Sequence, residues 1–462
     1  MDVLALARFQ FGFTVAFHYI YPPLSIGLGV VLVIIEALWL WKRDPLYYQM
    51  ARFWSRVFAL TFAIGVATGI VMEFEFGTNW ATYSRYVGDV FGSALAAEGI
   101  FAFFLESGFL AVLLFGWDRV GPRLHFFATL MVCLGAHFSA IWIVVADSWM
   151  QTPAGFHIVT EGVRTRAEVT DFWAMVFNPS SVVRLTHTVL GAWLAGAFLV
   201  ISISAWHILK GKFVEFARAS LKIGLSLALV SSILQIWAGH QSATVVAAHN
   251  PEKLAAIEGH YETGPARLHL FGWVNEKNER VDVGVSIPGL LSWLIYGDAE
   301  RPVTGLREFP AGDRPPVNVV FQLYHVMVAL GFALLLLALV AGYFAWRGTL
   351  WQRRKLLWVL VISVLGPQIA NQAGWFTAEI GRQPWIVYHL LRTSEGLSKK
   401  VQADAIVTSL ILFTLVYMLL FAVFIYLLHQ KIKHGPDEAD MRPAGKWALP
   451  KPLAESPPTP EN

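Results

Sequence analysis

The segment that decides the fold is LLWVLVISVLGPQIANQAGWF, residues 356–376, which continues directly into TAEIGRQPW, residues 377–385. The first stretch is apolar over about 20 residues, the length that an α-helix needs to cross a bilayer. The second places a carboxylate (Glu379) and a guanidinium (Arg382) where that span ends. A plain membrane anchor has no use for a carboxylate there, so the segment predicts a membrane helix that carries a functional group.

The composition of the whole chain agrees with a membrane protein. Of its 462 residues, 56% are hydrophobic and 15% are charged, whereas soluble domains carry about 25% charged residues. The formal net charge of +3 is too small to indicate a nucleic-acid partner. The single cysteine, Cys133, lies inside an apolar run, which excludes disulfides and thiolate metal clusters.

Apolar runs of membrane-crossing length recur about nine times. They lie near residues 10–40, 56–75, 93–115, 126–146, 182–207, 222–241, 318–345, 356–377 and 403–428. The sequence therefore predicts an all-α integral membrane protein, a bundle of about nine transmembrane helices.

Basic residues gather in the connections after spans 1, 3, 5 and 7 and after span 9. By the positive-inside rule the N-terminus is expected outside and the C-terminus in the cytoplasm. The basic loop after span 8 disagrees, but five connections outweigh it. Four segments follow: helices 1–6 in residues 1–241, an extracytoplasmic loop in 242–317, helices 7–9 in 318–430, and a proline-rich cytoplasmic tail in 431–462 whose composition predicts disorder.

Several ionisable or metal-ligating side chains lie within the spans and, with this orientation, in their outer halves. They are His18, Glu98, His187, His325, Met327 and Glu379. Such residues are costly in a membrane and therefore predict function. Imidazole, thioether and carboxylate groups in a dry bundle are typical of haem-iron ligation, and 33 Phe and 19 Trp could enclose porphyrins.

Each of these residues also has a simpler interpretation. A lone histidine in a span is more often a hydrogen-bonded core residue, and a lone methionine usually fills space. His325 and Met327 are two positions apart, about 200° around a helix, so at most one of them can face a given haem.

Glu98 and Glu106 are eight residues apart on the third span, about 12 Å along a helix axis. Two carboxylates at staggered depths could pass protons across part of the membrane. The alternative, that Glu106 is satisfied by a neighbouring hydroxyl or amide, stays open at this point.

Several motifs resemble those of subunit I of cytochrome bd-type quinol oxidases. The resemblance extends from the N-terminus through the ninth span, and the GRQPW motif is specific to that family. The matching stretches are MEFEFGTNW (72–80), FFLESGF (103–109), GWDRVG (116–121), WMQTP (149–153), KLAAIE (253–258), AGWFTAE (373–379) and GRQPW (381–385).

The resemblance implies a role for most of the membrane residues. His187 and Met327 resemble the axial pair of a low-spin haem b, which favours Met327 over His325. His18, Glu98 and Glu379 resemble the ligands of a high-spin haem b and of an oxygen-binding haem, which is haem d or a third haem b. Which of them ligates which haem stays open. Trp375 resembles the aromatic residue between haems, and Arg382 a propionate partner.

Lys253 and Glu258 resemble the quinol-binding pair of the family's outer loop. A base and a hydrogen-bond donor are what quinol oxidation requires, although KLAAIE alone would indicate only a surface charge pair. The loop lacks a long insertion and is similar to the short-loop type, often called cyanide-insensitive. His325 stands where better-known members carry arginine.

The function that the resemblance implies is that of a terminal oxidase in a prokaryotic cytoplasmic membrane. Quinol would be oxidised at the outer face, oxygen reduced to water, and protons drawn from the cytoplasm through Glu106 and Glu98. Expected partners are a subunit II, a small single-span subunit, lipid, quinol and oxygen, and no nucleic acid. The alternatives are a haem-b electron conduit without oxygen reduction and a proton-coupled transporter.

Overall fold

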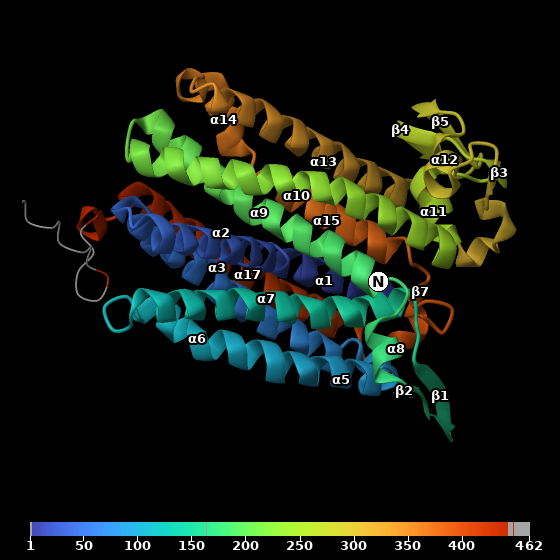
Figure 1. Cartoon of the computed structure of the whole chain (residues 1–462). Coiled ribbons are helices and arrows are strands. Elements are labelled where there is room, and N and C mark those ends of the chain that lie inside the picture. The colour runs from blue at the N-terminus through green and yellow to red at the C-terminus, as the bar shows by residue number, and fades with distance from the viewer. Residues whose placement is uncertain (1, 163, 442–446, 448–462) are drawn as a thin grey trace, which may run out of the picture.

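The structure, a computed structural model, describes residues 2–162, 164–441 and 447. Within these residues, nine helical segments are long and apolar enough to cross a membrane, which confirms the expected all-α membrane architecture. The long helices run side by side along one common axis (Figure 1).

The long helices of the first half of the chain include two that are interrupted. Their bounds are α1 (Val3–His18), α2 (Tyr21–Lys42), α3 (Pro45–Gly77), α5 (Gly88–Glu98), the π-helical turn η1 (Gly99–Phe103), α6 (Phe104–Phe115), α7 (Pro122–Gln151), α9 (Ser181–Lys210) and α10 (Val214–His249). The second half contributes α13 (Val317–Trp346), α14 (Arg354–Ile362), α15 (Leu365–Ile380) and α17 (Ala403–His434).

The short elements lie between these helices. The short helices are α4 (Ala81–Tyr86), α8 (Phe172–Val176), α11 (Pro251–Glu258), α12 (Leu290–Tyr296), α16 (Thr393–Gly396), η2 (Leu306–Glu308), η3 (Ala311–Asp313), η4 (Leu350–Gln352) and η5 (Glu438–Met441). The strands form four antiparallel pairs: β1 (Phe156–Glu161) with β2 (Arg164–Val169), β3 (Gly264–Pro265) with β6 (Pro302–Val303), β4 (Leu268–Asn275) with β5 (Arg280–Ile287), and β7 (Trp385–Val387) with β8 (Leu391–Arg392).

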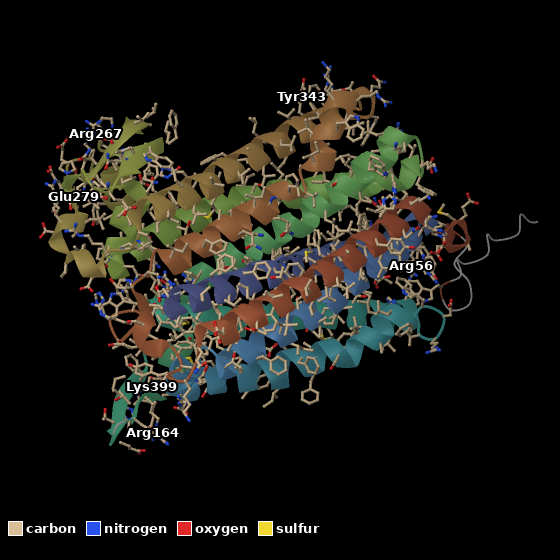
Figure 2. The ribbon with its side chains drawn as sticks, turned by 180° about the vertical axis from the view of Figure 1, so that it is seen from behind. Arg56, Arg164, Arg267, Glu279, Tyr343 and Lys399 are labelled. Carbon is tan, nitrogen blue, oxygen red and sulfur yellow. The ribbon has the colours of Figure 1, made fainter. Side chains whose placement is uncertain are left out.

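The two ends of the bundle differ in structure. The β1–β2 and β4–β5 hairpins lie at one end of the bundle. The labelled residues Arg164, Arg267, Glu279 and Lys399 are at this end, and Arg56 lies towards the other (Figure 2). We call these the loop end and the tail end, since α17 finishes at the second.

Three expected spans are interrupted. The eighth, expected near 356–377, is divided between α14 and α15 at residues 363–364, and the other two are interrupted for identifiable reasons. The first, expected near 10–40, is divided at residues 19–20, because Pro22 and Pro23 begin α2 and cannot continue the hydrogen-bond ladder of α1. The third contains the π-helical turn, which shifts the face on which later residues lie. The helix α10 continues to His249, so the expected loop at 242–317 starts later, where Asn250 and Pro251 end that helix.

The pair Gly65 and Gly69 on α3 allows the first helices to approach closely. A Cβ atom on Gly65 would lie 3.4 Å from Cβ of Tyr21, and one on Gly69 would lie 3.2 Å from Cε1 of His18. Small residues are what close packing in membranes requires, and here they set the position of His18.

The tail is ordered further than its composition predicted. Helix α17 continues to His434, and Asp440 forms an ion pair with Arg52 at 3.0 Å. The remainder of the predicted disordered tail, residues 442–446 and 448–462, lies outside the described residues.

Candidate functional site

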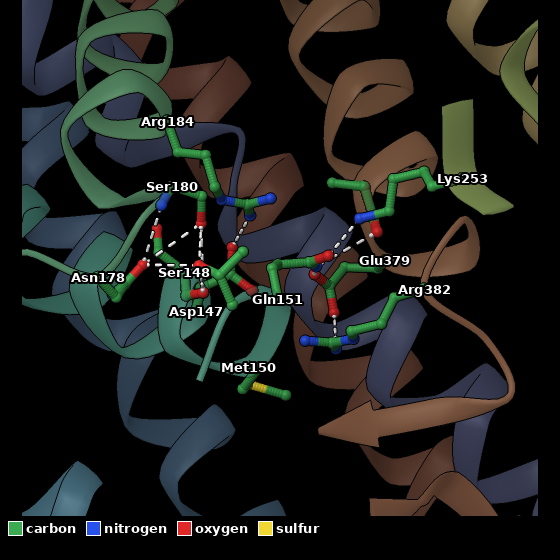
Figure 3. Close-up of polar contacts among 12 residues, drawn as sticks. Asp147, Ser148, Met150, Gln151, Asn178, Ser180, Arg184, Lys253, Glu379 and Arg382 are labelled. Atoms are coloured by element: carbon green, nitrogen blue, oxygen red, sulfur yellow. Dashed lines mark hydrogen bonds and ion pairs between the residues drawn. The ribbon is translucent and has the colours of Figure 1, made fainter. Parts of the chain in front are cut away.

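The carboxylate of Glu379 lies at the loop end of α15, where the helix stops at Ile380. It forms an ion pair with Arg382 and accepts a hydrogen bond from Nε2 of Gln151 at 3.0 Å (Figure 3). The two residues are three positions apart in the sequence, and the family resemblance implied that Arg382 binds a haem propionate. In the structure the guanidinium reaches the carboxylate itself.

Gln151, the last residue of α7, joins this pair to the outer loop. Its Oε1 accepts a hydrogen bond from Nζ of Lys253, while its Nε2 donates to Glu379 (Figure 3). Lys253 is only 4% exposed. Sequence reasoning missed Gln151, and its only signal was its place in the WMQTP motif.

A second ion pair, between Asp147 and Arg184, lies beside this cluster (Figure 3). The cluster therefore combines the carboxylates of Asp147 and Glu379 with three cationic side chains, those of Arg184, Lys253 and Arg382. Sequence reasoning did not identify Arg184, because its contact partner is 37 residues away in the chain.

Several N–H groups of the cluster have no partner among the described residues. Arg382 is 3% exposed, yet its Nε and Nη1 atoms make no hydrogen bond within that part of the chain, and neither does Nε of Arg184. Unpaired buried donors on a cation are costly. A bound carboxylate group, such as a porphyrin propionate, would satisfy them by charge-assisted hydrogen bonds, so these residues fit the expected haem.

Burial and the guanidinium groups of Arg184 and Arg382 lower the pKa of Lys253 to about 7. A lysine side chain with such a pKa can release a proton, or take one up again, near neutral pH.

Glu258, at the end of α11, is 1% exposed. Its Oε2 accepts a hydrogen bond from the backbone N–H of His269 at 3.1 Å, and its Oε1 has no partner within the residues that the structure describes. Burial raises the pKa of Glu258 to about 8. The surface charge pair that KLAAIE alone would indicate is therefore wrong, since Lys253 and Glu258 are both buried and have different partners.

Among the expected haem ligands, His18 occupies the last turn of α1. Its Nδ1 lies 2.9 Å from Oγ1 of Thr68 on α3. Thr68 fixes the ring and is a residue that the sequence did not single out.

His187 and Met327 lie on different helices, α9 and α13, and α10 packs against both. Nε2 of His187 lies 3.1 Å from the amide nitrogen of Gln235, and the buried Nδ1 has no partner in the described part of the chain. The sulfur of Met327 lies beside α15, where a Cβ atom on Gly374 would be only 2.7 Å from it. A ring nitrogen without a partner and a thioether inside the bundle fit an axial pair.

His325 differs from Met327 in its surroundings. Its Nδ1 lies 2.7 Å from the carbonyl oxygen of Phe321, and its Nε2 lies 2.9 Å from that of His269. Backbone groups thus occupy both ring nitrogens, which agrees with Met327 as the candidate ligand on this helix.

Glu98, on α5, and Glu106, on α6, both contact one face of α7. Oε1 of Glu98 accepts a hydrogen bond from Ser139 at 2.9 Å. A Cβ atom on Gly135 would come within 2.5 Å of Cγ of Glu106. Because Gly135 and Ser139 are one helical turn apart, the two carboxylates follow the same stripe. Glu106 is buried and has no hydrogen bond among the described residues, so the structure does not support the alternative of a satisfying neighbour.

Trp375 lies on α15 one turn before Glu379, with its ring 4.7 Å from that of Phe376. Within the described residues, the side chains of His, Cys, Asp and Glu form no group of three or more that could hold a metal ion alone. Haem iron is already held by the porphyrin and needs only axial ligands from the protein, so single ligands on separate helices are compatible with haem binding.

Comparison with known proteins agrees with this geometry. The family model of cytochrome bd terminal oxidase subunit I matches residues 6–436. The chain is 38% identical over 448 residues to the cytochrome bd ubiquinol oxidase subunit 1 of Bacillus subtilis (strain 168), covering 95% of each chain. It is 34% identical over 502 residues to the cytochrome bd-II ubiquinol oxidase subunit 1 of Escherichia coli (strain K12), covering 94% of this chain and 97% of the relative.

A solved structure gives the same result. The bd oxidase from Geobacillus thermodenitrificans matches with a TM-score of 0.87 and 32% identity, covering 94% of this chain and 99% of the matched chain.

Proposed function

The chain belongs to the cytochrome bd terminal oxidase subunit I family, and from this premise we propose that it oxidises quinol at the loop end and supports oxygen reduction with protons taken from the tail end. Membership makes it a haem-containing quinol oxidase of a respiratory chain and a multi-pass membrane protein. The observation that carries the proposal is the cluster of Glu379, Arg382 and Lys253, joined through Gln151.

Five residues would hold haem iron. His187 and Met327 would hold a low-spin haem b, and His18, Glu98 and Glu379 would hold a high-spin haem b and either a haem d or a third haem b. When bound, the haems supply one-electron transfer and an oxygen-binding iron. Trp375 would lie between them.

Arg382 would hold a propionate through the N–H groups that its pair with Glu379 leaves free.

Lys253 and Glu258 would hold the quinol head group. Glu258 would accept a hydroxyl proton and Lys253 would donate a hydrogen bond to a quinol oxygen. Their different surroundings support separate tasks, since Lys253 is connected through Gln151 to Glu379 and Glu258 contacts β4.

Glu106 and then Glu98 would carry protons from the tail end. With the C-terminus in the cytoplasm, as the basic connections predict, those protons come from the cytoplasm of a prokaryotic cell and quinol protons leave outside. The reaction then charges the membrane without a pump.

The family name supports assembly with a subunit II. We propose the same assembly for this chain, embedded in the cytoplasmic membrane, with a small single-span subunit as a further partner.

Oxygen consumption by the purified complex, driven by reduced quinol, tests the proposal. We expect turnover together with a carbon monoxide difference spectrum, because an oxygen-binding haem has an open coordination position. A haem-b conduit would give no carbon monoxide response, and a transporter would be colourless. Either result would overturn the proposal.

The pH dependence of quinol oxidation tests Glu258. Because its pKa is raised to about 8, the carboxylate fraction grows about tenfold per pH unit below that value, so kcat/KM should rise from pH 6 and level off near pH 8. In Glu258→Gln the rise towards pH 8 should disappear, because the amide cannot take up a proton.

The control for this measurement is Glu262→Gln, because Glu262 is an exposed carboxylate of the same loop that pairs with Arg307 at 2.5 Å. It should keep the profile of the unmodified protein. A Glu258→Gln variant with an unchanged profile would exclude Glu258 as the base.

A further inference from the structure

The two larger hairpins at the loop end differ in surface chemistry. The β1–β2 hairpin exposes ion-paired charges, with Arg166 contacting Glu161 at 2.9 Å and Glu168 at 2.6 Å. The β4–β5 hairpin exposes a row of apolar side chains, which we call the apolar hairpin face. Its members are Phe271, Trp273, Val283, Val285 and Ile287.

The register of β4 and β5 explains why these side chains share one face. Trp273 is paired with Val283, and Phe271 with Val285, and directly paired residues point to the same side of an antiparallel sheet. Trp273 is 60% exposed and Val283 is 70% exposed. Exposed apolar patches of this kind mark a surface that is covered by another molecule or by lipid.

The opposite face of the hairpin is fixed on the protein. Val274 is buried against Phe321 of α13, and a Cβ atom on Gly272 would lie 3.2 Å from the Phe321 ring. The hairpin is therefore held by its inner face and turns the apolar hairpin face away from the bundle.

Three hydrogen bonds set the depth of the hairpin along α13. Asn318 accepts from the N–H of Val274 at 3.1 Å, Gln322 donates to the carbonyl of Gly272 at 2.8 Å, and His325 contacts the carbonyl of His269 at 2.9 Å. These three α13 residues span about 10 Å of the helix.

The length of α13 places that stretch at the membrane boundary. Its 30 residues extend about 45 Å, whereas the hydrocarbon core is about 30 Å thick. The first five or so residues at the loop end therefore lie at the headgroup level. The hairpin is attached to Asn318 within this stretch and to Gln322 and His325 just beyond it, so it lies across the boundary.

The neighbouring side chains are those of a membrane interface. Trp293 and Tyr296 of α12 are exposed, and the guanidinium of Arg301 lies 4.2 Å from the centre of the Tyr296 ring. Tryptophan and tyrosine concentrate at headgroup level. Further along α13, Val326 and Phe332 are exposed within the span, so the lipid-facing surface of α13 begins at the depth of the hairpin.

We propose that the apolar hairpin face is seated in the lipid of the leaflet at the loop end, between headgroups and acyl chains. The polar turn at residues 275–280 stays in water, and the ion-paired β1–β2 hairpin extends into water on the other side of the bundle (Figure 1). Glu258 contacts His269 of β4. If the proposed function holds, this position of the hairpin in the lipid places Glu258 at the level where quinol head groups lie.

A fluorescent probe on single cysteines tests the lipid contact independently of activity. The complete complex, with Cys133→Ser to remove the one native thiol of this chain and with any cysteines of its partner subunits replaced, carries Val283→Cys or the matched control Thr165→Cys on β2. Both are labelled with nitrobenzoxadiazole and reconstituted in phosphatidylethanolamine–phosphatidylglycerol vesicles that contain 5-doxyl phosphatidylcholine.

We expect blue-shifted emission at position 283 and quenching by the doxyl lipid at least threefold stronger than at position 165. Equal, weak quenching at both positions would overturn the proposal. Blue-shifted emission without quenching would also overturn it, because it would show that a protein surface, of a second subunit or a second copy, covers the face. Val285→Cys repeats the measurement on the same face should the first label disturb the hairpin.

Discussion

Glu106→Gln should lower steady-state oxygen consumption with quinol by roughly 100-fold or more, the range expected for the loss of a positioned proton-transfer group. The amide keeps the size of the side chain but cannot carry a proton. Haem content and the reduced-minus-oxidised spectrum should stay unchanged, because no expected iron ligand other than Glu98 lies on this segment, and Glu98 keeps its hydrogen bond from Ser139.

The position of Glu106 supports an effect of this size. The side chain is 8% exposed, lies beside Gly135 and has no hydrogen-bond partner among the described residues. A structural carboxylate in a membrane would be paired. An unpaired one has acceptor sites free for water, through which protons can reach Glu98, which contacts Ser139 one turn along α7 from Gly135.

Two variants make this test specific. Gly135→Ala would place a Cβ atom 2.5 Å from Cγ of Glu106, so it should displace the carboxylate and slow turnover while keeping it titratable. Glu215→Gln removes an exposed carboxylate near the start of α10 and should leave turnover unchanged. Normal turnover in Glu106→Gln would remove this residue from the proton path.

The fold could be predicted well from the sequence because the bilayer imposes a simple length rule. Each span needs about 20 apolar residues, and nine such segments are present among the described residues. The interruptions within spans were harder. Pro22 and Pro23 could have indicated the break between α1 and α2, but the π-helical turn at Gly99–Phe103 has no comparable signal, since its residues are ordinary apolar ones.

The candidate site was predictable only in part. An ionisable residue in a span is conspicuous because its burial in lipid costs free energy, and this singled out Glu98, Glu106 and Glu379. Lys253 and Glu258 had no such signal, and only the family resemblance indicated them. Their burial comes from α11 packing against α10 and α13, which a short amphipathic stretch does not encode.

The connecting residues of the site were not predictable from local pattern. Gln151 contacts Lys253 and Glu379, which are 102 and 228 residues away in the chain. Such contacts depend on how α7, α11 and α15 come together at the loop end. Glutamine is common at helix ends, so the residue type of Gln151 does not indicate this connecting role.

His187→Ala should remove one haem b from the purified complex and reduce quinol oxidation by at least about 100-fold. Imidazole is one of two proposed axial ligands, and a thioether alone holds haem iron weakly. A reduced-minus-oxidised spectrum and a pyridine haemochromogen count measure the loss directly. The bundle itself should stay folded, because the His187 ring is not tightly packed against α10. A Cβ atom added to Gly239 would lie 3.7 Å from Cε1 of the ring, an ordinary contact distance.

A matched histidine separates ligation from packing. His137 on α7 also lies within a span, but Nδ1 faces the carbonyl of Cys133 at 2.7 Å and Nε2 lies 2.9 Å from the indole nitrogen of Trp193. His137→Ala should therefore keep every haem band, whereas Met327→Leu, which removes the other proposed ligand, should change the same band as His187→Ala. An unchanged spectrum in His187→Ala, or equal losses in His137→Ala, would show that His187 is a packing residue whose free Nδ1 holds no iron.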